Sequence, residues 1–150
     1  MILQPEAPPA APARHDGGMS RVSALSVART GAKLLLGSAL VFAGVSHLTR
    51  AREEFQAQVP EWVPLEKDTV VLASGVVEIG LGAALVVSRR TAPLVGNAAA
   101  AFFTAIFPGN VSQYLTKTSA FGLDTDRKRA VRLLFQPLLV AWALWSTRRP

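Results

Sequence analysis

Four long apolar segments, separated by short polar stretches, dominate this 150-residue sequence. They begin near Gly31, Val70, Ala92 and Val131. Crossing the hydrocarbon core of a bilayer as a helix takes roughly 20 mostly apolar residues, so four crossings would use most of the chain. Half of the residues are hydrophobic and only 17% are charged. The sequence therefore predicts an all-α fold, a four-helix transmembrane bundle, with little room for a second domain.

The membrane domain is expected to cover residues 21–150, with helices at about 29–48, 69–88, 92–115 and 126–146. Only Arg89 to Thr91 separate the second helix from the third, so these two must form a tight antiparallel hairpin. Pro108 removes a backbone hydrogen bond from the third helix and is followed by Gly109 and Asn110. This predicts a kink or a broken last turn there.

Two segments outside the predicted helices have their own composition. Residues 1–20 are rich in Pro and Ala without apolar periodicity, which predicts a disordered tail; Met19 is a second candidate for the true start. Residues 53–65 form a segment between the first two helices that is too polar to span a membrane. Pro60 and Pro64 prevent a continuous helix there, so it is expected to lie at the membrane surface with Trp62 at headgroup level.

The composition excludes several functions. The chain has no cysteine, which rules out disulfides, thiolate metal sites and thiol chemistry. Its 16 basic residues outnumber 10 acidic ones, but they mostly flank apolar segments, which indicates membrane anchoring and no nucleic-acid partner. The basic residues divide equally between the two sides of the membrane, with eight on each side. Four of them precede the first helix and three follow it. That margin favours cytoplasmic termini.

Glu78 is the most informative position because it lies in the middle of the second apolar segment, near the bilayer midplane. On insertion scales, a charged carboxyl group at this depth costs about 3 kcal/mol of insertion free energy. Glu78 must therefore be neutral, paired or beside a polar cavity. Small residues share its helical face, which predicts that it points into the bundle. Two interpretations follow: a functional acid, or a neutral carboxyl that hydrogen-bonds a neighbouring helix.

Three further polar residues lie in the same half of the membrane as Glu78, one on each other helix. They are His47, Asn110 and Gln136. We expect the four to converge as a ligand-binding site or proton relay, in a pocket lined by Trp62, Ser74, Gly75, Gly82 and Pro108. One histidine, one carboxylate and two carboxamides do not resemble a zinc or catalytic iron site, so no metal is predicted.

Two of these residues also have simpler interpretations. An imidazole at a helix end, such as that of His47, is often solvated or bonded to the helix terminus. Gln136 precedes Pro137, which frees a backbone carbonyl one turn earlier, and a nearby glutamine amide can satisfy such a group. Both interpretations stay open at the level of sequence.

Short motifs in a fixed order resemble the DoxX-like family of small bacterial membrane proteins. They are FAGVSHL at residues 42–48, VPEWVP at 59–64, SGVVEIGLG at 74–82 and FPGN at 107–110. The resemblance covers residues 31–145 and implies a four-helix membrane bundle in the bacterial inner (plasma) membrane. Some members of that family are membrane subunits of a thiosulfate:quinone oxidoreductase, and most have no assigned activity.

The leading hypothesis is therefore an accessory or quinone-binding membrane subunit of a redox system. Because the chain has no cysteine and no cofactor motif, redox work would require a partner subunit or a quinone bound in the bundle. Whether the chain is catalytic, and its oligomeric state, are left open. The alternative is a non-catalytic scaffold or small permease-like protein in which Glu78 is structural. A pocket requires space beside Glu78, whereas a scaffold requires a packed, fully bonded carboxyl.

Overall fold

The computed structural model describes residues 17–148, with side chains from residue 24 onward. This part of the chain is all-helical and contains no strand. The helices are α1 (Gly17–Leu48), α2 (Arg52–Gln56), α3 (Lys67–Val87), α4 (Ala92–Leu115) and α5 (Asp126–Thr147). All but the short α2 are long and apolar enough to cross a membrane. The predicted fold class is confirmed, and the four apolar helices indicate a multi-pass membrane protein.

The bounds of α3, α4 and α5 lie within two residues of those expected, whereas α1 begins earlier, at Gly17. Residues 17–20, expected to belong to a disordered tail, are helical, so that prediction was wrong for these four positions. No Gly or Pro interrupts residues 19–30, so helix propensity carries α1 beyond the apolar segment, which begins near Gly31. The rest of the expected tail, residues 1–16, lies outside the described residues.

α4 contains Pro108 but continues to Leu115, so its last turns are not broken as the sequence suggested. Later turns of this helix keep their own hydrogen bonds, and the backbone N–H of Thr116 still bonds to the carbonyl of Ser112. A proline removes one bond from a helix without ending it when neighbouring helices support the chain.

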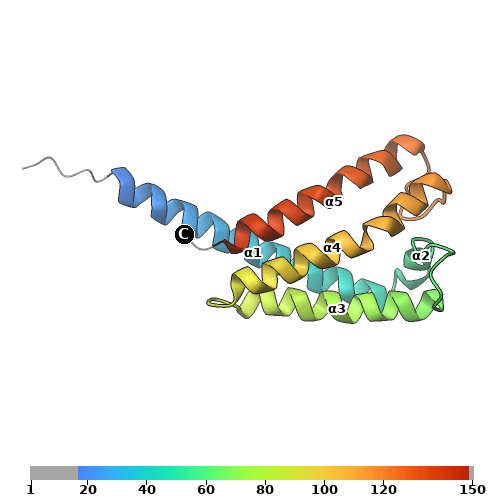
Figure 1. Cartoon of the computed structure of the whole chain (residues 1–150), viewed down its shortest axis with the longest axis horizontal. Helices are drawn as coiled ribbons and strands as arrows, with labels where there is room; N and C mark the ends of the chain where they lie inside the picture. The colour runs from blue at the N-terminus through green and yellow to red at the C-terminus, as the bar shows by residue number, and fades with distance from the viewer. Residues whose placement is uncertain (1–16, 149–150) are drawn as a thin grey trace, which may run out of the picture.

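The helices pack as two pairs. α1 packs most extensively against α3, and α4 against α5, while α1 and α5 connect the pairs and α3 touches α4 only sparsely. Figure 1 shows the α4–α5 pair diverging from the α1–α3 pair toward the end where α2 lies. The segment that begins with α2 covers this open end of the bundle.

Small residues allow α1 and α3 to approach closely. A Cβ atom added to Gly75 would lie 2.8 Å from Cβ of His47 and 3.0 Å from the carbonyl oxygen of Gly44. A Cβ on Gly82 would lie 2.5 Å from the carbonyl oxygen of Gly37, two turns away. Contacts of this kind are how membrane helices associate, because lipid supplies no hydrophobic driving force between them.

The segment after α1 is attached at two points. Arg52 donates a bidentate pair of hydrogen bonds to Asp68, in the first turn of α3, and Gln56 adds a third bond to the same carboxylate at 2.9 Å. Farther along, the carbonyl oxygen of Gln58 lies 2.7 Å from where a Cβ on Gly109 would be. The absence of a side chain at Gly109 therefore lets this segment sit directly on α4.

Candidate ligand-binding site

Three polar side chains from α1 and α3 meet inside the bundle. Ser74 and Glu78 lie one turn apart on the face of α3 that packs toward α1, and His47 lies in the last turn of α1. His47 and Glu78 are each only 6% exposed. The close contact between Gly75 and α1 holds the imidazole beside the carboxyl.

The hydrogen-bonding roles of Ser74 and His47 depend on each other. The hydroxyl of Ser74 donates its only hydrogen to the carbonyl of Val71 at 2.9 Å. In this arrangement its oxygen is an acceptor for Nδ1 of His47, which lies 3.1 Å away. The matching tautomer of the imidazole is the one with a proton on Nδ1. Phe55 packs against the other side of this ring, with centroids 3.5 Å apart.

The carboxyl of Glu78 is left incompletely bonded. Its Oε2 lies 3.5 Å from Nδ1 of His47, within the range of an ion pair. Nevertheless, Oε2 is buried and has no hydrogen-bond partner within the described part of the chain. Buried polar atoms without partners are rare and costly in proteins, and where they occur they often mark a site that another molecule completes.

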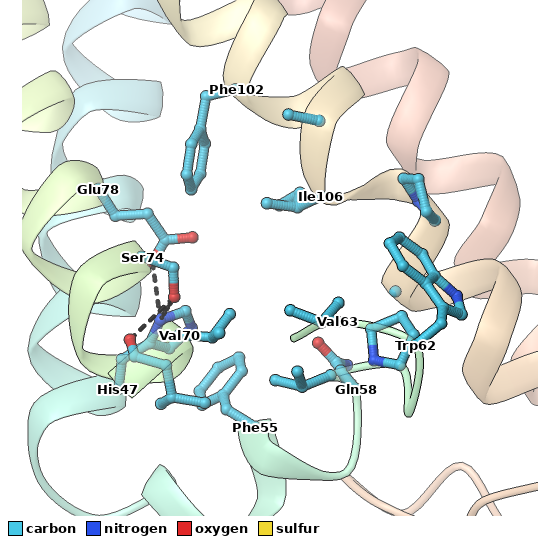
Figure 2. Close-up of a pocket in the computed structure, with 16 residues that line it drawn as sticks. His47, Phe55, Gln58, Trp62, Val63, Val70, Ser74, Glu78, Phe102 and Ile106 are labelled. Atoms are coloured by element: carbon cyan, nitrogen blue, oxygen red, sulfur yellow. Dashed lines mark hydrogen bonds and ion pairs between the residues drawn. The ribbon is translucent and has the colours of Figure 1, made fainter. Parts of the chain in front are cut away.

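A cavity of about 180 Å³ opens beside this group, as Figure 2 shows. Glu78, Ser74 and His47 form one wall, and Phe102 and Ile106 of α4 face them. The remaining lining residues come from α3, from α4 and from the segment after α1, namely Phe55, Gln58, Val59, Pro60, Trp62, Val63, Val70, Val71, Ala105, Pro108 and Gly109.

The cavity suits a small ring-shaped or amphipathic molecule. Its walls are mainly aliphatic and aromatic, and its ionisable groups are confined to the His47–Glu78 wall. An engineered protein cavity of about 150 Å³ is large enough to hold benzene, so this one has room for one aromatic ring. A mostly apolar pocket with a few convergent polar groups is the usual form of a small-molecule site.

A second polar cluster ties α4 to α5. Asn110 donates to Gln136 at 3.0 Å, and Gln136 in turn donates to the backbone carbonyl of Phe103. Arg132, one turn before Gln136, donates to the amide oxygen of Asn110 at 3.2 Å. With its amide oxygen turned toward Arg132, Gln58 also accepts from Nη2 at 2.7 Å. This cluster is internally bonded, in contrast to Glu78.

The structure thus brings the four predicted site residues together as two pairs, His47 with Glu78 and Asn110 with Gln136. Only the first pair lines the cavity. The amide of Gln136 does satisfy a backbone carbonyl, but that carbonyl belongs to α4 and not to the turn before Pro137.

Of the five residues expected to line a pocket, Trp62, Ser74 and Pro108 do so. Trp62 is 71% exposed and lies at the edge of the cavity (Figure 2). Gly75 and Gly82 lie instead in the contact between α3 and α1, where they set the distance between the helices.

Sequence reasoning missed several residues of the site. Arg132, which bonds to Asn110, could have been found, because its position one turn before Gln136 places both residues on one face of α5. Phe55 and Gln58 carry no signal that could have found them, because their places depend on how the irregular segment after α1 folds over the bundle. Within the described residues, no group of three or more His, Asp or Glu side chains lies close enough to hold a metal ion.

Comparison with known proteins gives a family without an assigned activity. No curated protein and no solved structure matches the chain. Residues 36–147, which include α3, α4, α5 and all the polar residues of the site, match the family described as a domain of unknown function (DUF8561). The chain belongs to this family.

Proposed function

We propose that this protein is a DoxX-like membrane subunit that binds a quinone, or a similar small amphipathic molecule, in the cavity beside His47 and Glu78, and serves a redox partner. The observation that carries the proposal is the buried Oε2 of Glu78, which has no hydrogen-bond partner among the described residues and borders an apolar cavity of about 180 Å³. A ligand that offers a polar atom to Glu78 and a ring to the cavity would remove both the unmet hydrogen bond and the void.

A quinone head group has the required chemistry. Its carbonyl oxygens accept hydrogen bonds, and its ring is apolar and flat. In its protonated form Glu78 would donate to one carbonyl oxygen, while Phe102 and Ile106 would contact the ring. Each electron that reduces a quinone to the hydroquinone is matched by a proton, which the neighbouring His47 and Glu78 could hold or deliver. The electrons would come from the partner, because this chain has no cysteine or cofactor motif.

Shape and composition also support a ligand that comes from the bilayer. The cavity lies between α3 and α4, which touch less than any other pair of long helices in contact. A lipophilic molecule could therefore reach Glu78 between these helices without crossing an aqueous phase. We place the protein in the bacterial inner membrane with cytoplasmic termini, in keeping with the DoxX-like motifs and the basic residues before α1.

The competing function is a scaffold in which the polar residues only hold helices together. The internally bonded Asn110–Gln136 pair suits that role. Glu78 does not suit it, because a structural carboxyl would be packed and fully bonded, whereas this one borders a void.

Binding can be tested with the protein in lipid nanodiscs and a short-chain quinone, by following quenching of Trp62 fluorescence. The Trp62→Phe variant identifies the signal of Trp62 among the three tryptophans of the chain. We expect saturable quenching, and a loss of about tenfold in affinity in Glu78→Leu, which removes the hydrogen-bond donor; this loss is about 1.4 kcal/mol. Glu61→Leu is the matched control, because the side chain of Glu61 is 85% exposed and lies outside the cavity.

An alkylbenzene with the same tail but no carbonyl group should bind at least tenfold more weakly, or about 1.4 kcal/mol less favourably. Quenching that rises without saturation, or an equal effect of Glu78→Leu and Glu61→Leu, would contradict the proposal. Unimpaired folding of Glu78→Leu together with unchanged quinone binding would favour the scaffold.

A further inference from the structure

A second cavity lies at the opposite end of the bundle, where α3 ends and α4 begins. It has a volume of about 170 Å³ and lies among the first half of α1, the α3–α4 connection and the last turn of α5. Four basic side chains line it, namely Arg29, Lys33, Arg89 and Arg148. Its remaining lining residues are Ser26, Thr30, Ala92, Pro93, Ser146 and Thr147, with no acidic side chain among them.

These cations come from separate parts of the sequence and are brought together by the fold. Arg29 and Lys33 lie one turn apart on α1, Arg89 lies in the connection after α3, and Arg148 directly follows α5. Lysines and arginines that merely anchor helix ends are expected to spread around the bundle and extend into water. Convergence of four of them on one hollow needs a different explanation.

Lys33 differs most clearly from a residue that only anchors a helix end at the membrane surface. Its side chain is buried, with 8% of the residue exposed, and its ammonium group donates to the backbone carbonyl of Ser88. An ammonium group has three hydrogens, so this bond leaves donor capacity for a further acceptor. A buried cation flanked by further cations is unfavourable unless an anion compensates it.

The end of α4 adds to the positive field. The N-cap residue Thr91 makes no side-chain hydrogen bond to the first turn, which contains Ala92 and Pro93, both in the cavity wall. The N-terminus of a helix carries a partial positive charge and free backbone donors. The field of α4 therefore has the same sign as that of the four side chains.

From this geometry we propose that the cavity among Arg29, Lys33, Arg89 and Arg148 binds a phosphate group. Guanidinium and ammonium donors that converge from several directions are the usual recognition of phosphate. The volume accommodates a phosphate group with a few waters, given that a water occupies about 30 Å³. The site is separate from the His47–Glu78 cavity and does not depend on the quinone proposal.

The position of the site indicates what carries the phosphate. The ends of four membrane-crossing helices lie at the level of the lipid headgroups, and basic pockets between such helices recognise anionic lipids. A free phosphate ion from the adjacent aqueous phase has the same binding chemistry. The experiment therefore separates a lipid from a soluble source.

The test uses the full chain in nanodiscs that contain equal amounts of phosphatidylglycerol and phosphatidylcholine, released into the gas phase for native mass spectrometry. We expect the protein to retain phosphatidylglycerol in preference to phosphatidylcholine. Arg89→Gln and Arg148→Gln should each reduce the retained phosphatidylglycerol about tenfold, equivalent to about 1.4 kcal/mol. Both residues are exposed, so these variants should fold, and unchanged melting in phosphatidylcholine alone verifies it.

Arg90→Gln is the matched control, because this arginine is adjacent in sequence and equally charged but does not line the cavity. It should retain phosphatidylglycerol as the unsubstituted chain does. The second arm adds millimolar inorganic phosphate to the protein in phosphatidylcholine nanodiscs. A higher melting temperature of the unsubstituted chain, without a change in Arg89→Gln, would assign the same site to a soluble phosphate. The absence of both effects, or an equal loss in Arg90→Gln and Arg89→Gln, would overturn the proposal.

Discussion

Asn110 and Glu78 show two different solutions for a polar side chain inside an apolar bundle. Asn110 is bonded on both sides, donating to Gln136 and accepting from Arg132, so its burial at 6% exposure is compensated. Glu78 is equally buried but keeps one oxygen without a hydrogen bond in the described part of the chain. The first arrangement contributes to stability, and the second stays available for a ligand.

A double-mutant cycle on Asn110→Ala and Gln136→Ala should reveal this structural role. Interhelical hydrogen bonds in membrane proteins contribute about 0.6 kcal/mol on average and up to about 1.7, and the coupling energy should fall in that range. Unfolding in mixed micelles measures it. Quinone binding should persist in both single variants, since neither residue lines the cavity. Zero coupling energy would show that the 3.0 Å contact does not stabilise the bundle.

At the scale of single residues, the sequence predicted the features that depend on the depth of a residue in the membrane and on its position around the helix axis. Glu78 was expected to point inward among small residues, and it does, because its stripe of Val71, Gly75, Gly82 and Leu85 is the buried face of α3. Helical phase does not specify which neighbouring helix each residue meets. For this reason Gly75 was expected in the pocket but packs against α1.

The close packing of α1 against α3 depends on glycines, which have no side chain to keep the two backbones apart. Gly44 and Gly75 face each other so closely that a Cβ on Gly44 would lie 2.5 Å from the carbonyl oxygen of Gly75. The same contact places His47 beside Ser74 and Glu78. Helix spacing and site geometry are therefore coupled in this pair.

Gly75→Ala should destabilise the protein by about 1–3 kcal/mol, because the added methyl group overlaps His47 and Gly44 and forces the helices apart. It should also weaken quinone binding by moving His47 away from Glu78. Gly80→Ala, on the same helix, is the control, since nothing lies within 4 Å of the added atom. Unfolding free energies of the two variants decide the matter, and equal values would disprove the close-packing argument.

Among the elements, the long helices were predictable because hydropathy and length define a membrane span almost independently of context. The short α2 and the segment after it were expected at the membrane surface. They do carry exposed residues such as Trp62 and Leu65, yet they also close one end of the cavity. Their folding depends on tertiary contacts, including Arg52 with Asp68 and Gln58 with Gly109, that no local pattern encodes.

For the whole molecule, four crossings would put the beginning of α1 and the end of α5 on one side of the membrane and the α4–α5 connection on the other. A reporter that is active only in the periplasm should be silent when fused after Pro150 and active when inserted after Ser119, in that connection. The physical reason is the excess of basic residues before the first span over those after it. The reverse pattern would invert the topology and place the four-cation cavity on the periplasmic side.

The pairing of α1 with α3 and of α4 with α5 also bears on how the chain assembles during synthesis. Membrane helices insert first and associate afterwards, and a nascent chain offers its N-terminal elements before the rest. We therefore expect the α1–α3 hairpin, with His47, Ser74 and Glu78 already in register, to be complete while α5 is still being made. The α4–α5 hairpin would then dock as a unit, with Trp142 donating to the carbonyl of Ala32 on α1. In this order the cavity is the last part of the molecule to form, because it is enclosed between the two helix pairs.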